Sequence, residues 1–173
     1  MSLFHQAARP LNPLSWIALP ALLCVLATIL LGVPLRLWGL SLPEPVFALV
    51  PAFAWAVIRP SVLPALFLLL LGLFMDIFWG GPLGLWPLGL LAAYSLVLAN
   101  RAGMIGQSGV VLWAWYAAAA LTAETACLLL SMLDAHAAPN LVAVLWQYLA
   151  TAALYPFAHI LIQRYEDADV RFR

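Results

Sequence analysis

Long apolar segments follow one another along this chain with little polar sequence between them, and this pattern limits the possible folds more than any motif does. The first is an uncharged segment from Leu14 to Pro34, and several others approach or exceed the roughly 18 residues of a membrane-spanning helix. In a soluble protein such segments would be core helices. The chain has too little polar sequence to cover them, because 66% of its residues are hydrophobic and only 8% are charged. We therefore expect an all-α integral membrane protein.

The apolar segments predict a single polytopic membrane domain, residues 1–173, with six transmembrane helices joined by short loops. Prolines lie in or beside the second, third and fourth segments, which predicts helices that are short or proline-broken and that neighbouring helices bury. The six predicted spans cover residues 14–34, 45–58, 61–78, 83–98, 110–133 and 140–162.

The distribution of arginines supports six spans and gives their orientation. If both termini are cytoplasmic, only Arg36 lies outside; an odd number of spans would spoil this partition. The seven basic residues are matched by seven acidic ones, which leaves no basic face for nucleic acid. The arginines expected in the cytoplasm are Arg9, Arg59, Arg101, Arg164, Arg171 and Arg173.

Asp76 is the first candidate site, because a carboxylate near the end of a membrane helix is costly unless a partner, water or backbone amides receive it. Structural readings are that it accepts hydrogen bonds from amides of the turn 79–81, or that it reaches outer water. It can also contact a protein partner or a ligand, or pair with Arg36. The sequence leaves these alternatives open.

Glu124 is the second candidate site, fourteen residues into the fifth segment and so about 21 Å of helix rise from its start, near the bilayer midplane. Thr122, Thr125 and nearby alanines give it a small, mildly polar surrounding, which is typical of close helix contacts in membranes. We expect Glu124 to be a protonated or hydrogen-bonded contact between helices, or to act on a ligand or proton. Intramembrane acid catalysis would require Asp76 and Glu124 to lie close together.

The glycines after Asp76 predict a tight turn that opens the fourth span. Gly80 and Gly84 fit the small-xxx-small pattern, but Pro82 lies between them, which favours a turn over a helix-dimer motif. Gly80 and Gly81 are expected to have positive φ. A bulky side chain at Gly84 is expected to push the adjoining helices apart.

Motifs for other chemistry are weak or missing. Asp134 and His136 would be half of a metal site, and no third ligand stands at a useful spacing. The sequence has no glycine-rich phosphate loop, HExxH or GxSxG motif, and no long extramembrane segment in which to build an ordinary catalytic centre. We therefore expect no enzyme activity, no cofactor and no metal.

The segment Gly72-Leu-Phe-Met-Asp76-Ile-Phe-Trp-Gly80-Gly-Pro-Leu-Gly84, followed by an apolar helix with Tyr94 and then Arg101, resembles the central signature of the rod shape-determining protein MreD family. Chain length, short loops and Tyr155-Pro156 in the last helix are also similar to that family. Tyr94 stands one residue earlier than the usual aromatic residue, and Glu124 is not part of the family motif.

The resemblance implies a non-enzymatic scaffold in the bacterial cytoplasmic membrane, a subunit of the cell-elongation complex that helps coordinate peptidoglycan synthesis and cell shape. Its expected partners are an MreC-type bitopic protein, MreB and the peptidoglycan synthase complex indirectly, and membrane lipid. The expected fold is similar to the substrate-binding subunits of energy-coupling vitamin transporters. The alternative function is therefore that of a substrate-binding transporter subunit, with Asp76 and Glu124 facing an outward pocket.

Overall fold

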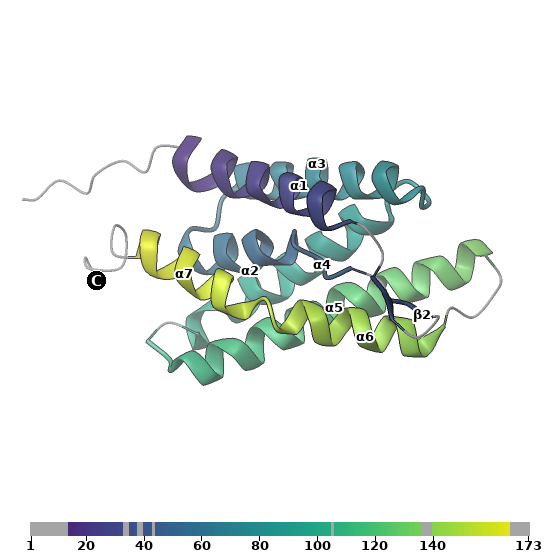
Figure 1. Cartoon of the computed structure of the whole chain (residues 1–173). Coiled ribbons are helices and arrows are strands. Elements are labelled where there is room, and N and C mark those ends of the chain that lie inside the picture. Colours follow the sequence, from purple (N-terminus) through teal and green to yellow (C-terminus); the bar gives the residue numbers. More distant parts are fainter. Residues whose placement is uncertain are drawn as a thin grey trace, which may run out of the picture.

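The computed structural model describes residues 14–32, 35–37, 40–42, 44–104, 106–135 and 140–166, and these residues form a helical bundle (Figure 1). A π-helical turn, Leu14–Ala18, leads into the first α-helix, and a 3-10 turn, Arg101–Gly103, follows the fourth. The α-helices are α1 (Leu19–Leu31), α2 (Leu49–Ile58), α3 (Val62–Trp79), α4 (Leu85–Asn100), α5 (Gly109–Ala135), α6 (Leu141–Ala152) and α7 (Tyr155–Glu166).

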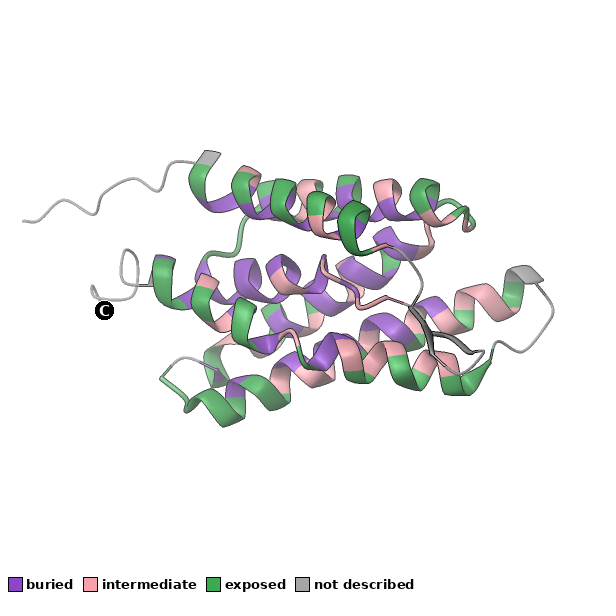
Figure 2. Ribbon diagram, in the orientation of Figure 1, coloured by how far each residue is buried: buried purple, intermediate pink, exposed green. Residues whose placement is uncertain are grey.

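Three helical segments are long and apolar enough to cross a membrane: Val62–Trp79, Gly109–Leu133 and Leu141–Tyr165, the last formed by α6 and α7. Many large apolar side chains on the surface of the bundle are exposed, which is unusual for a soluble monomer and normal where lipid is the solvent (Figure 2). These features agree with the helical, multi-pass membrane class predicted from the sequence.

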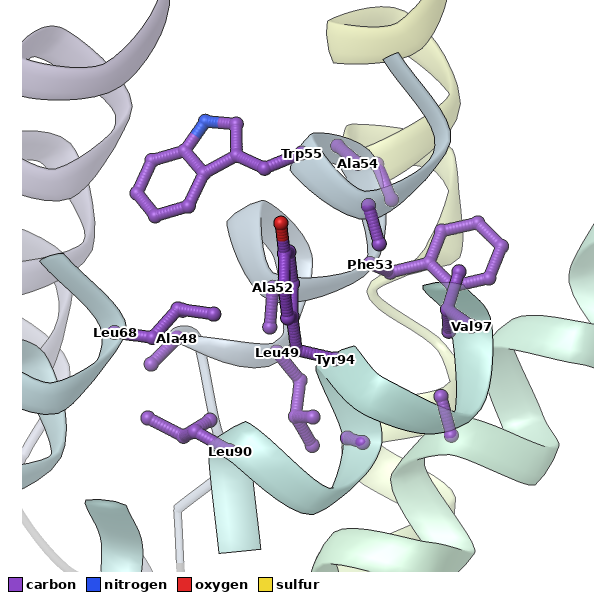
Figure 3. Close-up of a cluster of buried hydrophobic side chains, with 14 of the residues drawn as sticks. Ala48, Leu49, Ala52, Phe53, Ala54, Trp55, Leu68, Leu90, Tyr94 and Val97 are labelled. Carbon is purple, nitrogen blue, oxygen red and sulfur yellow. The ribbon is translucent and has the colours of Figure 1, made fainter. Parts of the chain in front are cut away.

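The short helix α2 lies in the middle of the bundle. All of its residues except Val50 are buried, and helices of this kind, apolar on every side, belong in a core (Figures 2 and 3). Side chains from α3 and α4, among them Leu68 and Tyr94, surround it (Figure 3). The Trp55 indole nitrogen donates to the Trp16 carbonyl oxygen at 2.8 Å. Ten residues give about 15 Å of helix, so α2 alone reaches across half of a bilayer core.

Helices α3 and α4 are continuous, and the prediction that prolines break the third and fourth segments is wrong. Pro64 and Pro87 both lie in the first turn of their helices. A first-turn residue has no partner for its N–H inside the helix, so proline costs little there. The last predicted span, residues 140–162, was expected to be one helix and is instead interrupted. It is divided at Ala153 and Leu154, because Pro156 can neither donate to the carbonyl of the preceding turn nor avoid its oxygen.

A two-stranded antiparallel hairpin, absent from the all-α prediction, follows α1. Strands β1 (Leu35–Leu37) and β2 (Leu40–Leu42) pair so that Arg36 lies opposite Ser41. In both strands leucines alternate with one polar residue, a period of two that three residues are too few to reveal in a sequence.

The bundle has two distinct ends. The start of α1 and the end of α7 lie at one end, and the hairpin lies at the other (Figure 1). Arg101 reaches carbonyl oxygens at the end of α2, and Tyr165 donates to the Ser15 carbonyl oxygen at 2.6 Å, so four chain segments meet at the first end. Arg59, Arg101 and Arg164 therefore stand at that end, and the backbone of Arg36 is in the hairpin.

Candidate functional site

Asp76 joins the end of α3 to the beginning of α4. Its Oδ2 accepts a hydrogen bond from the Gly84 amide at 2.6 Å, and its Oδ1 accepts one from the Trp86 amide at 3.0 Å. The Asp76 side chain is fully buried. Gly84 is the N-cap residue of α4 and has no side chain with which to cap the helix, so Asp76 supplies the missing acceptor from the preceding helix. The carboxylate also faces the positive end of the α4 dipole.

Asp76 accepts hydrogen bonds from backbone amides, as one of the sequence alternatives proposed. The donors, however, are not the predicted amides of the turn 79–81. The amides of Gly80 and Gly81 donate to the Asp76 backbone carbonyl oxygen, the latter at 2.9 Å, and close the C-terminus of α3. The side chain instead reaches eight and ten residues along the chain. Since the loop after Gly81 must fold back to bring these amides to the carboxylate, counting residues in the sequence does not identify them.

Three glycines between residues 72 and 84 are each required for a different structural reason. A Cβ at Gly72 would lie 2.4 Å from the Pro87 backbone nitrogen, so this glycine permits close approach of α3 to α4. Gly80 and Gly84 have φ of 66° and 99°, a backbone conformation that other residues rarely adopt. Gly81 is not among the glycines with positive φ, contrary to the prediction. A Cβ at Gly84 would meet nothing within 4 Å, so even a small substitution there costs backbone strain, and the expectation that a bulky side chain separates the helices stays a prediction.

Aromatic and polar side chains extend this turn toward the hairpin end. Trp79 and Trp86 pack edge to face with ring centroids 5.2 Å apart. The Trp79 indole nitrogen donates to Glu44 Oε1 at 3.0 Å, and Gln147 Nε2 donates to the Glu44 carbonyl oxygen at 3.1 Å. Glu44 therefore connects the end of α3 with α6. Sequence reasoning missed Glu44, whose only signal was a carboxylate between two prolines.

Burial raises the pKa of the Glu44 carboxyl group, and the hydrogen bond from Trp79 lowers it by a smaller amount. Glu44 Oε2 is buried without a hydrogen-bond partner among the described residues. The protein thus favours the protonated carboxylic acid at this position more than water does.

Glu124 is buried on α5 with 5% of its surface exposed, and its Oε1 has no hydrogen-bond partner within the described parts of the chain. The neighbouring Cys127 thiol points to the Leu85 carbonyl oxygen at 3.5 Å and lies within electrostatic range of both Asp76 and Glu124. A Cβ at Gly89 would lie 2.6 Å from the Cys127 sulfur, so α4 and α5 are also in close contact here. Cys127 therefore lies near both sequence-predicted carboxyl groups, where α5 contacts the beginning of α4.

Two glycines are used for close helix contacts inside the bundle, as the Gly72–Pro87 and Gly89–Cys127 approaches show. An apolar cavity of about 420 Å³ lies between α1, α2 and α7. Neither Asp76 nor Glu124 lines it, nor do Trp79 and Trp86.

The arrangement around Asp76 can fix the geometry of two helices, and its carboxylate oxygens are both occupied by amides. The described residues contain no group of three His, Cys, Asp or Glu side chains that could hold a metal ion, and His136 and the side chains of Arg36 and Asp134 lie outside the described parts. In comparisons with known proteins, no family model, curated protein or solved structure matches this chain.

Proposed function

We propose that this chain is a non-enzymatic scaffold subunit of the bacterial cell-elongation complex, of MreD type, that binds an MreC-type bitopic membrane protein. Through that partner it acts on MreB and the peptidoglycan synthase complex. The observation that carries the proposal is the pair of hydrogen bonds from Gly84 and Trp86 to Asp76. With them, the residues from Gly72 to Gly84 that carry the resemblance to MreD fall into one helix–turn–helix unit in which Asp76 has a structural role.

The proposal includes six membrane crossings with both termini in the cytoplasm. The segment between α1 and α3 starts at the hairpin end and returns to the other end through α2, so it counts as a crossing although α2 is short (Figure 1). A short helix is tolerated in a membrane when other helices bury it, as they do α2. The three arginines Arg59, Arg101 and Arg164 would then face the cytoplasm.

The surface next to the Asp76 turn is the proposed contact for the partner's transmembrane helix. Ile77 and Leu83 flank the turn and are 72% and 74% exposed. Because Asp76 and Gly72 fix α3 against α4, these side chains are held in a rigid arrangement. A preorganised apolar surface loses little entropy when a second helix packs on it.

The proposal is tested by tagging the protein at its natural expression level, solubilising the membrane in mild detergent and identifying bound proteins by mass spectrometry. We expect a single-span, periplasmic coiled-coil protein of MreC type, followed by cell-wall synthesis enzymes. Recovery of paired ATPases with a coupling membrane subunit would instead make the chain a transporter component. Recovery of a small molecule and no other membrane protein would also contradict the scaffold function.

A further inference from the structure

The cavity between α1 and α7 has the form of a long apolar groove. Leu19, Leu23, Ala27 and Leu31 recur at every fourth residue of α1 and make one wall, and residues of α7 make the opposite wall. In Figure 1, α2 lies between α1 and α7, and its first turn contributes to the groove lining. Apart from Arg164 and Tyr165, the lining side chains carry no charge or hydroxyl group.

The polar side chains stand together at one end of the groove. Tyr165 is held there by its hydrogen bond to the Ser15 carbonyl oxygen, and the Arg164 guanidinium lies 5.9 Å from the centre of the Tyr165 ring. Arg164 is exposed, and no side chain in the described ranges forms an ion pair with it. The exposed, positively charged Arg164 therefore marks the end of the groove that lies at the termini of the bundle.

The dimensions of the groove fit one hydrocarbon chain better than a helix. Leu19 and Leu31 are the first and last of 13 residues, and the helix rises about 18 Å between them, close to the roughly 15 Å depth of one leaflet's hydrocarbon. A helix of that length and about 10 Å in diameter occupies roughly three times the 420 Å³ of the cavity. The groove therefore suits an extended chain with a negative group at its polar end.

We propose that the groove binds an anionic phospholipid of the surrounding leaflet, with an acyl chain along α1 and α7 and the phosphate at Arg164. The leaflet is the cytoplasmic one if the proposed orientation holds, but the site itself does not depend on a protein partner. Interhelical pockets with basic side chains at their polar end suit anionic headgroups. The lipid would fill the space between α1 and α7, beside the hydrogen bond from Tyr165 to the Ser15 carbonyl oxygen.

The test uses the purified full-length protein, delipidated in detergent and titrated with dioleoyl phosphatidylglycerol or with dioleoyl phosphatidylcholine, with bound lipid counted by native mass spectrometry. We expect tighter binding of phosphatidylglycerol. Arg164→Gln should weaken it about 5-fold, the effect of one basic side chain near an anionic headgroup, and Arg164→Lys should restore it. Ala27→Phe fills the groove and should abolish binding of either lipid.

Two control variants test whether a loss of lipid binding is specific to the groove. Arg59→Gln removes an exposed arginine outside the groove lining, and Leu66→Phe enlarges an exposed side chain on α3; both should bind as the unaltered protein does. Equal binding of the two lipids, an equal loss in Arg59→Gln, or full binding by Ala27→Phe would overturn the proposal. Leu23→Trp replaces Ala27→Phe if circular dichroism shows that the latter is misfolded. Because no partner protein is present, failure here leaves the scaffold proposal standing.

Discussion

At the scale of single residues, Asp76 is the acceptor on which the α3–α4 turn depends. Asp76→Ala leaves the half-buried Gly84 amide and the buried Trp86 amide without this partner, at about 1–3 kcal/mol for each, with the smaller loss at Gly84. We expect a lower thermal transition temperature in detergent and lower accumulation in the membrane. Asp76→Asn keeps one acceptor oxygen, so its thermal transition temperature should lie between those of Asp76→Ala and the unaltered protein. Equal stability of Asp76→Ala and the unaltered protein would show that the two hydrogen bonds do not matter.

Gly72 and Gly81 give a matched pair of glycine substitutions. Gly72→Ala places a Cβ 2.4 Å from the Pro87 backbone nitrogen, which cannot move without moving α4, so we expect a loss of about 1–3 kcal/mol. The nearest atom to a Cβ at Gly81 is 4.0 Å away, and Gly81→Ala should be close to neutral. Thermal stability in detergent measures both. If Gly81→Ala is the more damaging change, the close approach of α3 and α4 is not the reason for Gly72.

Glu44 predicts a dependence of stability on pH. Its pKa is higher in the folded protein than in the unfolded chain, so the folded protein binds the proton more tightly. The resulting stabilisation is fully present below the unfolded pKa and is lost as pH rises through the folded pKa. Glu44→Gln should therefore be more stable than the unaltered protein at neutral pH, and the difference should shrink in acid. Thermal scans of the two proteins from acid to neutral pH measure this; a constant difference would contradict it.

The sequence identified important single residues but not the groups that they contact. Asp76 and Glu124 were identified because a carboxyl group in an apolar segment is expensive wherever the chain folds. The amides that receive Asp76 depend on the path of the loop. The role of Gly72 depends on Pro87 opposite it, and that of Gly84 depends on its positive φ. Glu44 stands out only when α3 and α6 are brought together, since its hydrogen-bonding partners are 35 and 103 residues away.

At the scale of elements, α2 depends on a side chain from another helix. Arg101 Nε donates to the Val57 carbonyl oxygen at 2.8 Å, and its second guanidinium nitrogen donates to the Ile58 carbonyl oxygen at 3.1 Å. The last carbonyls of a helix have no partner within it, so Arg101 closes the C-terminus of α2. From the sequence, Arg101 was expected among the cytoplasmic arginines that set the orientation, and its contact with α2 was not predicted.

Arg101→Lys separates these two roles. Lysine keeps the positive charge that directs orientation and lacks the planar group that reaches two carbonyls at once. We expect normal orientation in a reporter fusion and a stability loss of about 1.5–3 kcal/mol in detergent. Arg101→Gln should lose comparable stability. Full stability of Arg101→Lys would mean that charge, rather than the two hydrogen bonds, is what the position requires.

The helices themselves were largely predictable, because apolar length is a local property of the chain. Whether each helix is continuous was not predictable. Pro64 and Pro87 lie in the first turns of helices and Pro156 interrupts one, so the effect of a proline depends on where each helix starts. The hairpin and the burial of α2 on all sides are set by packing partners that a period or a composition does not identify.

At the scale of the whole molecule, the bundle presents two different surfaces. The groove between α1 and α7 ends at the exposed Arg164, whereas the surface beside the Asp76 turn is apolar. The first is proposed to bind lipid and the second to bind a partner helix. The two proposals therefore assign different occupants to different faces.

The most direct test of the scaffold account is photo-cross-linking in living cells from single positions on these surfaces. A photoreactive residue at Ile77 is compared with one at Leu30, which is 73% exposed on α1. The account predicts that Ile77 cross-links to a single-span protein of MreC type and that Leu30 does not. Cross-linking of that protein from Leu30 alone, or from neither position while both variants accumulate normally, would contradict it.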